Sequence, residues 1–342
     1  MLPAVHWFVS RPHADRAPAL PSAYSPISRG GIVVLLAASI LIVAMLMYGA
    51  DLSIAPFAAA TLTYAFVFAL LGAIRWFCRA GGTPAARVAR DLAEYVGLFA
   101  AIALVGAVAS YPVAAYSHGF VDPMLQRIDL ALHFHWLDWY RAVAAHSWLQ
   151  AASRTAYAMI YVSPAILLAY LAITDQRREA HEFMVAVWLA ATITLAAFRF
   201  MPAVGPFAYL WHGPIPYLPV SDLWQPQLIP QLRDHAVASV DLGHLVGLVS
   251  APSFHAASGV LLIAFAWRQP LLRWPLTAIN AAMLLSTPVE GTHYLADMIL
   301  GAVVALIALG VVVQIRGGSA PLRAPAFDRA GDDRFLVADV AP

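Results

Sequence analysis

The chain alternates between long apolar runs and short polar connections. Eight apolar runs can be drawn, at about 31–49, 54–77, 92–115, 155–173, 183–203, 252–267, 274–289 and 293–315. Most of these runs are long enough to cross a hydrocarbon core of about 30 Å as a helix that rises about 1.5 Å per residue. Because lipid offers no hydrogen-bond partners to an open sheet, the pattern predicts an all-α polytopic membrane bundle of about eight transmembrane helices.

The segments around these runs predict four parts. Residues 1–30 are rich in proline and predict an irregular cytoplasmic segment. Residues 31–115 hold the N-terminal membrane helices, of which the first lacks a clear cleavage site and is interpreted as a retained helix. Residues 116–315 form a second membrane region with two long loops, and the polar residues 316–342 predict a disordered cytoplasmic tail.

Arginine supplies every basic side chain and predicts the orientation of the helices. With the N-terminus placed in the cytoplasm, the inner segments hold 15 of the 20 arginines. The remaining five fall on or beside outer segments and are Arg127, Arg141, Arg154, Arg199 and Arg233. This asymmetry follows the positive-inside rule, so we expect both termini to be cytoplasmic.

The same topology leaves two long loops on the outer face, at 116–154 and 204–251. Loops of this length in a compact protein are often functional. The first loop is rich in aromatic residues, which predicts an amphipathic segment lying in the membrane interface. These residues are Trp136, Trp139, Tyr140 and Trp148.

Composition narrows the class of protein. Hydrophobic residues make up 61% of the chain and charged residues only 11%, whereas a soluble domain carries about a quarter charged residues. These values exclude an ordinary soluble domain and a disordered chain, and a net charge of +1 gives no field that would recruit nucleic acid. The single Cys78 can form neither an internal disulfide nor a structural zinc site by itself.

Polar residues stand out where the later apolar runs begin and end. Pro252-Ser253-Phe254-His255 opens the sixth run and Thr292-His293-Tyr294-Leu295-Ala296-Asp297 opens the eighth, while Arg199 ends the fifth. The chain crosses the membrane twice between His255 and His293, so both histidines and Arg199 are expected on the outer face. These positions therefore form the candidate site.

Their spacing indicates a particular chemistry. His293 and Asp297 are four residues apart, on one side of a helix, so the carboxylate can hold one imidazole nitrogen and leave the other as a nucleophile. His255 lies at a helix start, where free N–H groups can bind a phosphate oxyanion and Ser253 can add a hydroxyl. Thr292 is the better candidate for a helix cap than Asp297. Together these groups favour phosphoryl transfer through a phosphohistidine.

The two motifs resemble those of the type 2 phosphatidic acid phosphatase superfamily of membrane lipid phosphatases and phosphotransferases. Pro252-Ser253-Phe254-His255 is similar to its PSGH motif, and Ser286, His293 and Asp297 match its SRxxxxxHxxxD motif. The resemblance covers about residues 183–315. It implies that His293 is the nucleophile, that Asp297 orients it, and that His255 protonates the leaving group. It also implies a lipid phosphate or phospholipid substrate, with neither a metal nor another cofactor.

The chain departs from the superfamily pattern at its phosphate-binding positions. Thr287 stands where the third motif has arginine, and in the first motif, KxxxxxxRP, Thr192 and Phe200 replace the lysine and proline around Arg199. The forms PSxHA and HYxxD look more like the inositol phosphorylceramide synthase branch, as do Asp122-Pro123, Asp129 and Trp136-Leu137-Asp138-Trp139. In that branch an arginine from the outer loop is a plausible phosphate ligand. Arg233 is our first candidate for this role and Arg199 the second.

Two other interpretations remain open. A metal site built from His244, His255, Glu290, His293 and Asp297 would supply suitable ligands, but no HExxH spacing is present. A non-catalytic lipid-binding or transport protein on the same scaffold would be expected to lack one of the core residues. The expected location is the inner or plasma membrane of a bacterium, with the active site of the catalytic membrane domain 116–315 on the outer, periplasmic face.

Overall fold

The computed structural model describes residues 27–318 apart from residue 222. Within these ranges the chain forms helices joined by loops and contains no strand, and an isolated bridge pairs Ser53 with Ser239. The predictions for the proline-rich segment 1–26 and the tail 319–342 lie outside the described residues.

Each predicted apolar run corresponds to a helix. These helices are α2 (Arg29–Gly49), α3 (Ala59–Phe77), α4 (Pro84–Ala115), α7 (Ser147–Ile173), α8 (Arg177–Phe198), α11 (Phe254–Ala266), α12 (Arg273–Glu290) and α13 (Leu295–Gly318). In the described part of the chain, six are long and apolar enough to cross a membrane, namely α2, α3, α4, α7, α8 and α13. The all-α polytopic bundle is confirmed, although α11 and α12 are not among these six.

Local capping explains where several helices begin. Ser28 accepts a hydrogen bond from Gly31 N at 3.0 Å at the start of α2, and Thr83 accepts one from Ala86 N at 3.2 Å at the start of α4. Pro84 then occupies the first turn of α4, where its missing N–H has no cost. These side chains satisfy N–H groups that the helix itself leaves unpaired.

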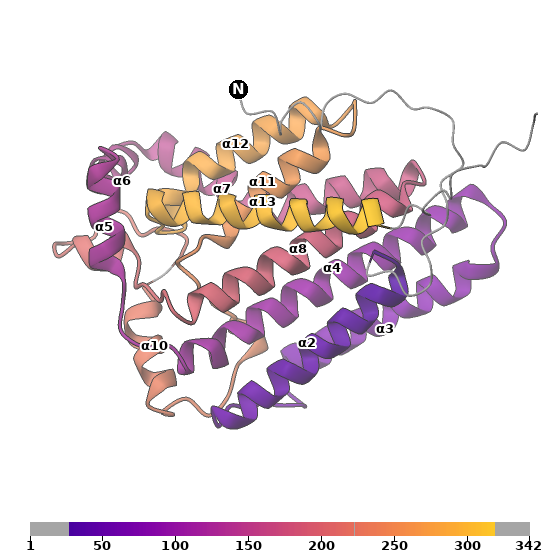
Figure 1. The fold of residues 1–342 in the computed structure, drawn as a ribbon, viewed down its shortest axis with the longest axis horizontal. Helices are drawn as coiled ribbons and strands as arrows, with labels where there is room; N and C mark the ends of the chain where they lie inside the picture. Colours follow the sequence, from indigo (N-terminus) through magenta and orange to yellow (C-terminus); the bar gives the residue numbers. More distant parts are fainter. Residues whose placement is uncertain (1–26, 222, 319–342) are drawn as a thin grey trace, which may run out of the picture.

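The bundle has two parts that meet at α8. On one side α11 packs against α7, α12 and α13, and on the other α2 and α3 pack against α4. Figure 1 shows α8 between α4 and α13, and the largest apolar core joins these parts through residues such as Phe183, Leu261 and Val304. Helix α3 has no buried residue, which is typical of a helix that faces lipid on most of its surface.

The two ends of the bundle are built differently. Figure 1 shows α5 (Asp122–Ala131), α6 (Trp136–Ala144) and α10 (Gln225–Arg233) gathered at the end where α11 and α13 begin. We call this the histidine end, because residues 253–255 and 291–297 lie there. The opposite end carries the connections 78–83, 174–176 and 267–272, and we call it the arginine end.

The aromatic segment of the first loop differs from its prediction. Trp136 is 1% exposed, Tyr140 is fully buried, and both pack with Phe207 of the second loop. Trp136 also donates a 2.7 Å hydrogen bond to Pro288 O. Placing these two rings in the membrane interface was therefore wrong, because the second loop provides a buried surface that the sequence pattern does not reveal. Trp148, at 66% exposed, remains available to the interface.

Candidate functional site

The centre of the histidine end is a buried histidine–carboxylate pair. His293 Nδ1 lies 3.0 Å from Asp297 Oδ1, and Asp297 Oδ2 accepts a hydrogen bond from Tyr294 N at 3.0 Å. Both side chains are buried. An ionised carboxylate at this position favours the tautomer with the proton on Nδ1. In the described residues no hydrogen bond engages Nε2, so this nitrogen keeps its lone pair for a reacting atom.

The turn before His293 is shaped by contacts with its neighbours. His293 N donates to Pro288 O at 3.1 Å, and Thr292 adopts a left-handed conformation with φ 50°. A Cβ at Gly291 would lie 2.7 Å from His293 Cδ2 and 3.1 Å from the ring of Tyr157. A glycine is therefore required here to leave room for the imidazole.

The start of α13 is capped by another helix. Asp129 of α5 accepts hydrogen bonds from Leu295 N at 3.0 Å and Ala296 N at 2.8 Å. The expectation that Thr292 caps this helix was wrong, since the left-handed turn is followed by a cap that comes from a distant segment. Burial raises the pKa of the Asp129 carboxyl, and the two N–H bonds oppose that rise.

His255 lies in the first turn of α11, next to the pair. Its ring stacks on Tyr157 of α7 with a centroid separation of 4.6 Å and lies 5.7 Å from the ring of His293. Ser253 accepts a hydrogen bond from Ala256 N at 3.2 Å and therefore acts as the cap of α11. Ser253 N also donates to Asp297 O at 3.0 Å, which ties the starts of α11 and α13 together.

A second carboxylate joins the two loops to the site. Asp122 accepts hydrogen bonds, each 3.0 Å long, from Val204 N, Gly205 N and the hydroxyl of Tyr294. Gly205 has φ +90°, and a Cβ there would lie 2.8 Å from Thr292 O. The two loops and the start of α13 therefore form one connected unit around the histidines.

Glu290 anchors a further part of the second loop. Its buried carboxylate accepts hydrogen bonds from the hydroxyl of Tyr217 at 2.7 Å and from Val220 N at 3.2 Å. Arg154 of α7 donates to the same hydroxyl at 2.8 Å and to Leu218 O at 2.9 Å. Tyr157 and Tyr217 are neighbours of the site that were not predicted from the sequence. Arg154 and Tyr157 lie three residues apart where the apolar run 155–173 begins. This spacing was the available indication that α7 contributes side chains to the site.

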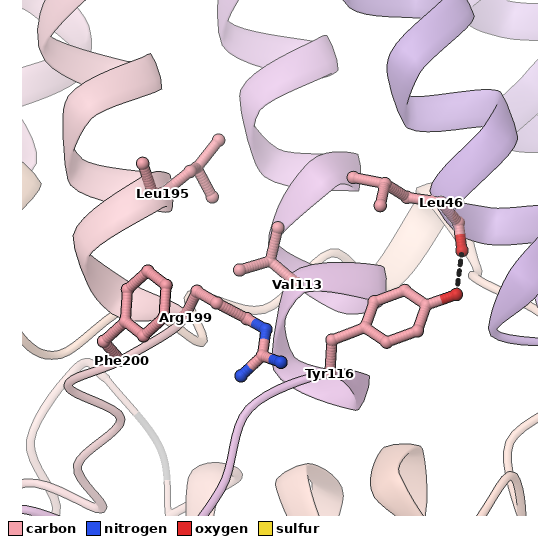
Figure 2. A pocket seen from close by; sticks show the side chains of 7 residues that line it. Leu46, Val113, Tyr116, Leu195, Arg199 and Phe200 are labelled. Carbon is pink, nitrogen blue, oxygen red and sulfur yellow. Dashed lines mark hydrogen bonds between the residues drawn. The ribbon is translucent and has the colours of Figure 1, made fainter.

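The two predicted phosphate-binding arginines lie on other elements. Arg233 of α10 donates to Ser117 Oγ at 2.9 Å and to Gly119 O at 2.8 Å, and burial lowers the pKa of its guanidinium. Arg199 follows α8 and lines an apolar cavity (Figure 2). Across the described ranges neither guanidinium forms a hydrogen bond or ion pair with His255, His293 or Asp297.

The position that carries arginine in the family pattern has a different role here. Thr287 is fully buried, and its hydroxyl donates to Met283 O at 2.8 Å within α12. The neighbouring Ser286 makes the same kind of bond to Met283 O at 2.7 Å. Neither hydroxyl is presented to a ligand, so any cation at the site must come from another element.

The residues considered for a metal site do not form one ligand group in the described structure. The searched residues contain no group of three or more His, Cys, Asp or Glu side chains that could hold a metal ion. His244 instead lies 2.7 Å from Asp241 in an exposed loop, and Glu290 is engaged by Tyr217.

Comparison with known proteins identifies the family. The model of the PAP2 superfamily matches residues 123–311, from the first turn of α5 into α13. The chain belongs to the PAP2 superfamily. Its superfamily region contains the His293–Asp297 pair and His255 and leaves α2, α3 and α4 outside. No curated protein and no solved structure matches the chain.

Membership supports a phosphatase-type activity on a lipid phosphate in a membrane, as the motifs predicted. The match begins well before residue 183, so it also includes α5 and α6 of the first loop, which lie outside the range 183–315 given for the motif resemblance. The closer similarity to inositol phosphorylceramide synthases stays a prediction.

Proposed function

We propose that this protein is a metal-independent lipid phosphatase or phosphotransferase that works through a phosphohistidine on His293. The observation that carries the proposal is the buried pair of His293 and Asp297, with Nδ1 held at 3.0 Å and Nε2 left without a hydrogen bond in the described structure. A histidine oriented in this way is an activated nucleophile.

In the first step His293 Nε2 attacks the phosphorus atom of the substrate. A P–N bond forms, the P–O bond to the leaving group breaks, and the leaving oxygen takes a proton from protonated His255. Asp297 stabilises the positive charge that develops on the His293 imidazole, as the acid of a catalytic triad does. The 5.7 Å between the two ring centroids leaves His255 beside the reacting bond.

In the second step an acceptor oxygen attacks the phosphohistidine. His255, now neutral, removes the proton of the acceptor, and the P–N bond breaks to release His293. Water as the acceptor completes a phosphatase cycle, whereas the hydroxyl of a lipid or polyol completes a transfer. The two reactions use the same protein groups and differ in which acceptor reaches the phosphohistidine.

The histidine end offers positive charge for a phosphate. Of the five arginines assigned to the outer segments, four form no ion pair with a carboxylate in the described residues, namely Arg127, Arg154, Arg199 and Arg233. At the start of α11, the N–H groups of Phe254 and His255 also lack partners in the part of the chain described. Preorganised donors of this kind stabilise transition-state charge. Arg233 is our first candidate for a direct phosphate contact, followed by Arg199 and Ser253.

The proposed orientation places the site on the outer membrane face, with both termini cytoplasmic. It is supported by the distribution of arginines, since 15 of the 20 fall in the segments assigned to the cytoplasm. The alternative function is a non-catalytic lipid-binding or transport protein on the same scaffold. Such a protein would bind lipid phosphate without forming a covalent intermediate.

Trapping the intermediate tests the proposal directly. Purified protein is mixed briefly with a lipid phosphate labelled with ³²P and quenched in alkali, in which phosphohistidine is stable. We expect label on the wild type and none on His293→Ala. His244→Ala, which changes an exposed histidine bonded to Asp241, is the matched control and should label normally. Full turnover by His293→Ala would refute the assignment.

The same preparation separates the two acceptor chemistries and tests the metal-free mechanism. Release of free phosphate supports hydrolysis, and exchange of the head group without release supports transfer. Activity should persist in excess EDTA. Activity that EDTA abolishes and added metal restores would contradict the proposed mechanism.

A further inference from the structure

A cavity separate from the histidine pair lies among three of the candidate membrane spans. It has a volume of about 360 Å³ and lies between α2, α4 and α8. Figure 2 shows the side chains that line it, which are Leu46, Val113, Tyr116, Leu195, Ala196, Arg199 and Phe200. None of His255, His293 and Asp297 is among them. The volume falls in the range of small-molecule sites, about 300–1,000 Å³.

Arg199 is the charged residue of this cavity, and its charge is not compensated. In the described structure its guanidinium forms neither a hydrogen bond nor an ion pair, and it lies 5.6 Å from the ring centroid of Phe200. The hydroxyl of Tyr116 is already used, because it donates to Leu46 O at 3.4 Å. A half-buried charge among apolar walls is costly without a partner, so this cavity is suited to bind an anion.

The walls of the cavity suit a hydrocarbon chain. Apart from Arg199 and the Tyr116 hydroxyl, the lining side chains are apolar. Phe200 is 77% exposed, and α2, α4 and α8 are each long and apolar enough to cross a membrane. A ligand can therefore enter sideways from the bilayer, with its charged group at Arg199 and its chain between the helices.

We propose that this cavity binds an anionic phospholipid of the surrounding membrane, with the headgroup phosphate on Arg199 and an acyl chain along α2, α4 and α8. Guanidinium and phosphate form paired, charge-assisted hydrogen bonds, and the apolar walls exclude a free, fully hydrated anion. The cavity is lined by none of His255, His293 and Asp297, and lipid binding there does not require the proposed phosphohistidine, although it uses Arg199, our second candidate for the phosphate contact. It gives α2 and α4, which lie outside the superfamily match, a role in lipid binding.

Lipid binding to purified, delipidated full-length protein tests the proposal. Native mass spectrometry measures the affinity for phosphatidylglycerol and, for comparison, for zwitterionic phosphatidylcholine. We expect Arg199→Gln to weaken phosphatidylglycerol binding by about 10-fold or more, because charge-assisted hydrogen bonds are lost. Phosphatidylcholine, whose phosphate is neutralised by its own choline cation, should bind the wild type more weakly and lose less affinity in this variant. Arg127→Gln is the matched control, since Arg127 is exposed and donates to Pro123 O outside the cavity.

A second variant keeps the test decisive if Arg199→Gln fails to fold. Ala196→Phe fills the cavity and retains the charge, so it should also weaken phosphatidylglycerol binding. His293→Ala should bind phosphatidylglycerol normally, which separates this site from the catalytic proposal. Wild-type affinity in either cavity variant would overturn the inference. So would equal competition by inorganic phosphate, because the site would then recognise the anion without the chain.

Discussion

Buried carboxylates at the two ends of the bundle are stabilised by different partners. At the arginine end Glu182 is fully buried, 2.9 Å from Arg268 and 3.0 Å from Arg178. In the same region Glu94 lies 2.6 Å from Arg75 and 3.0 Å from His181. At this end the buried carboxylates therefore pair with arginine and histidine side chains.

At the histidine end, backbone N–H groups and tyrosine hydroxyls donate hydrogen bonds to the buried carboxylates. Asp129 is held by two backbone N–H groups, and Asp122 by two more and the hydroxyl of Tyr294. Glu290 accepts from Tyr217 and Val220. No arginine forms an ion pair with these buried acids in the ranges described.

The difference explains how an end with buried acids can still attract an anion. Ion pairs at the arginine end use the guanidinium charges, whereas backbone N–H groups stabilise a carboxylate without consuming a cation. Arg199 and Arg233 therefore keep their charge for a ligand. We therefore interpret the arginine end as the part that stabilises the bundle through ion pairs, and the histidine end as the part proposed to bind a phosphate.

The largest expected effect comes from Asp297→Asn. The amide favours the wrong tautomer of His293, so activity should fall by about 10³–10⁴-fold while the thermal unfolding temperature stays close to that of the wild type. Steady-state release of phosphate from a lipid phosphate measures the loss. Asp138→Asn, which changes an exposed carboxylate 3.3 Å from Arg141, is the control and should be fully active. Near-normal activity of Asp297→Asn would show that the carboxylate does not orient the nucleophile.

Glu182→Gln should have the opposite result to Asp297→Asn, because it should lower stability and leave activity unchanged. It removes the fully buried counter-charge of Arg268 and Arg178 and leaves Arg268 only the less buried Glu179 at 2.7 Å, so the free energy of unfolding should fall by about 3 kcal/mol. Specific activity of the folded fraction should not change, because Glu182 lies far along the helices from the histidines. Unfolding in detergent checks the first point. Asp175→Asn breaks an exposed pair with Arg87 and should cost about 0–1 kcal/mol. Equal effects of the two variants would remove the distinction between buried and exposed pairs.

Asp129→Asn should have the smallest effect of the three. The amide oxygen retains one of the two bonds to Leu295 N and Ala296 N, so we expect a loss of about 1 kcal/mol, as for a helix cap. Because burial raises the pKa of Asp129, its negative charge is itself disfavoured, and neutralising it costs little. The same unfolding experiment measures this variant. If Asp129→Asn lowered the free energy of unfolding as much as Glu182→Gln, carboxylates bonded to N–H groups would not differ from carboxylates in ion pairs as we infer.

Sequence pattern alone was sufficient to place the helices and to predict the contact of His293 with Asp297. Apolar runs indicated the helices because a span needs a minimum length in lipid. The spacing of His293 and Asp297 also indicated their contact, although His293 lies in the turn just before α13 and not on the helix itself as predicted. The alternation of polar and apolar segments also predicted that His255 and His293 lie at the same end.

Contacts between distant segments could not be read in this way. Tyr157 stacks on His255, Asp129 caps α13 and Trp136 is buried under the second loop, each across roughly 70–170 residues of chain. Arg199 stays a candidate phosphate ligand from its place in a degenerate motif, but its position in a cavity with α2 and α4 could not be predicted from that motif. Such contacts depend on how whole helices pack, whereas helix length and residue spacing depend on local backbone geometry and on the membrane.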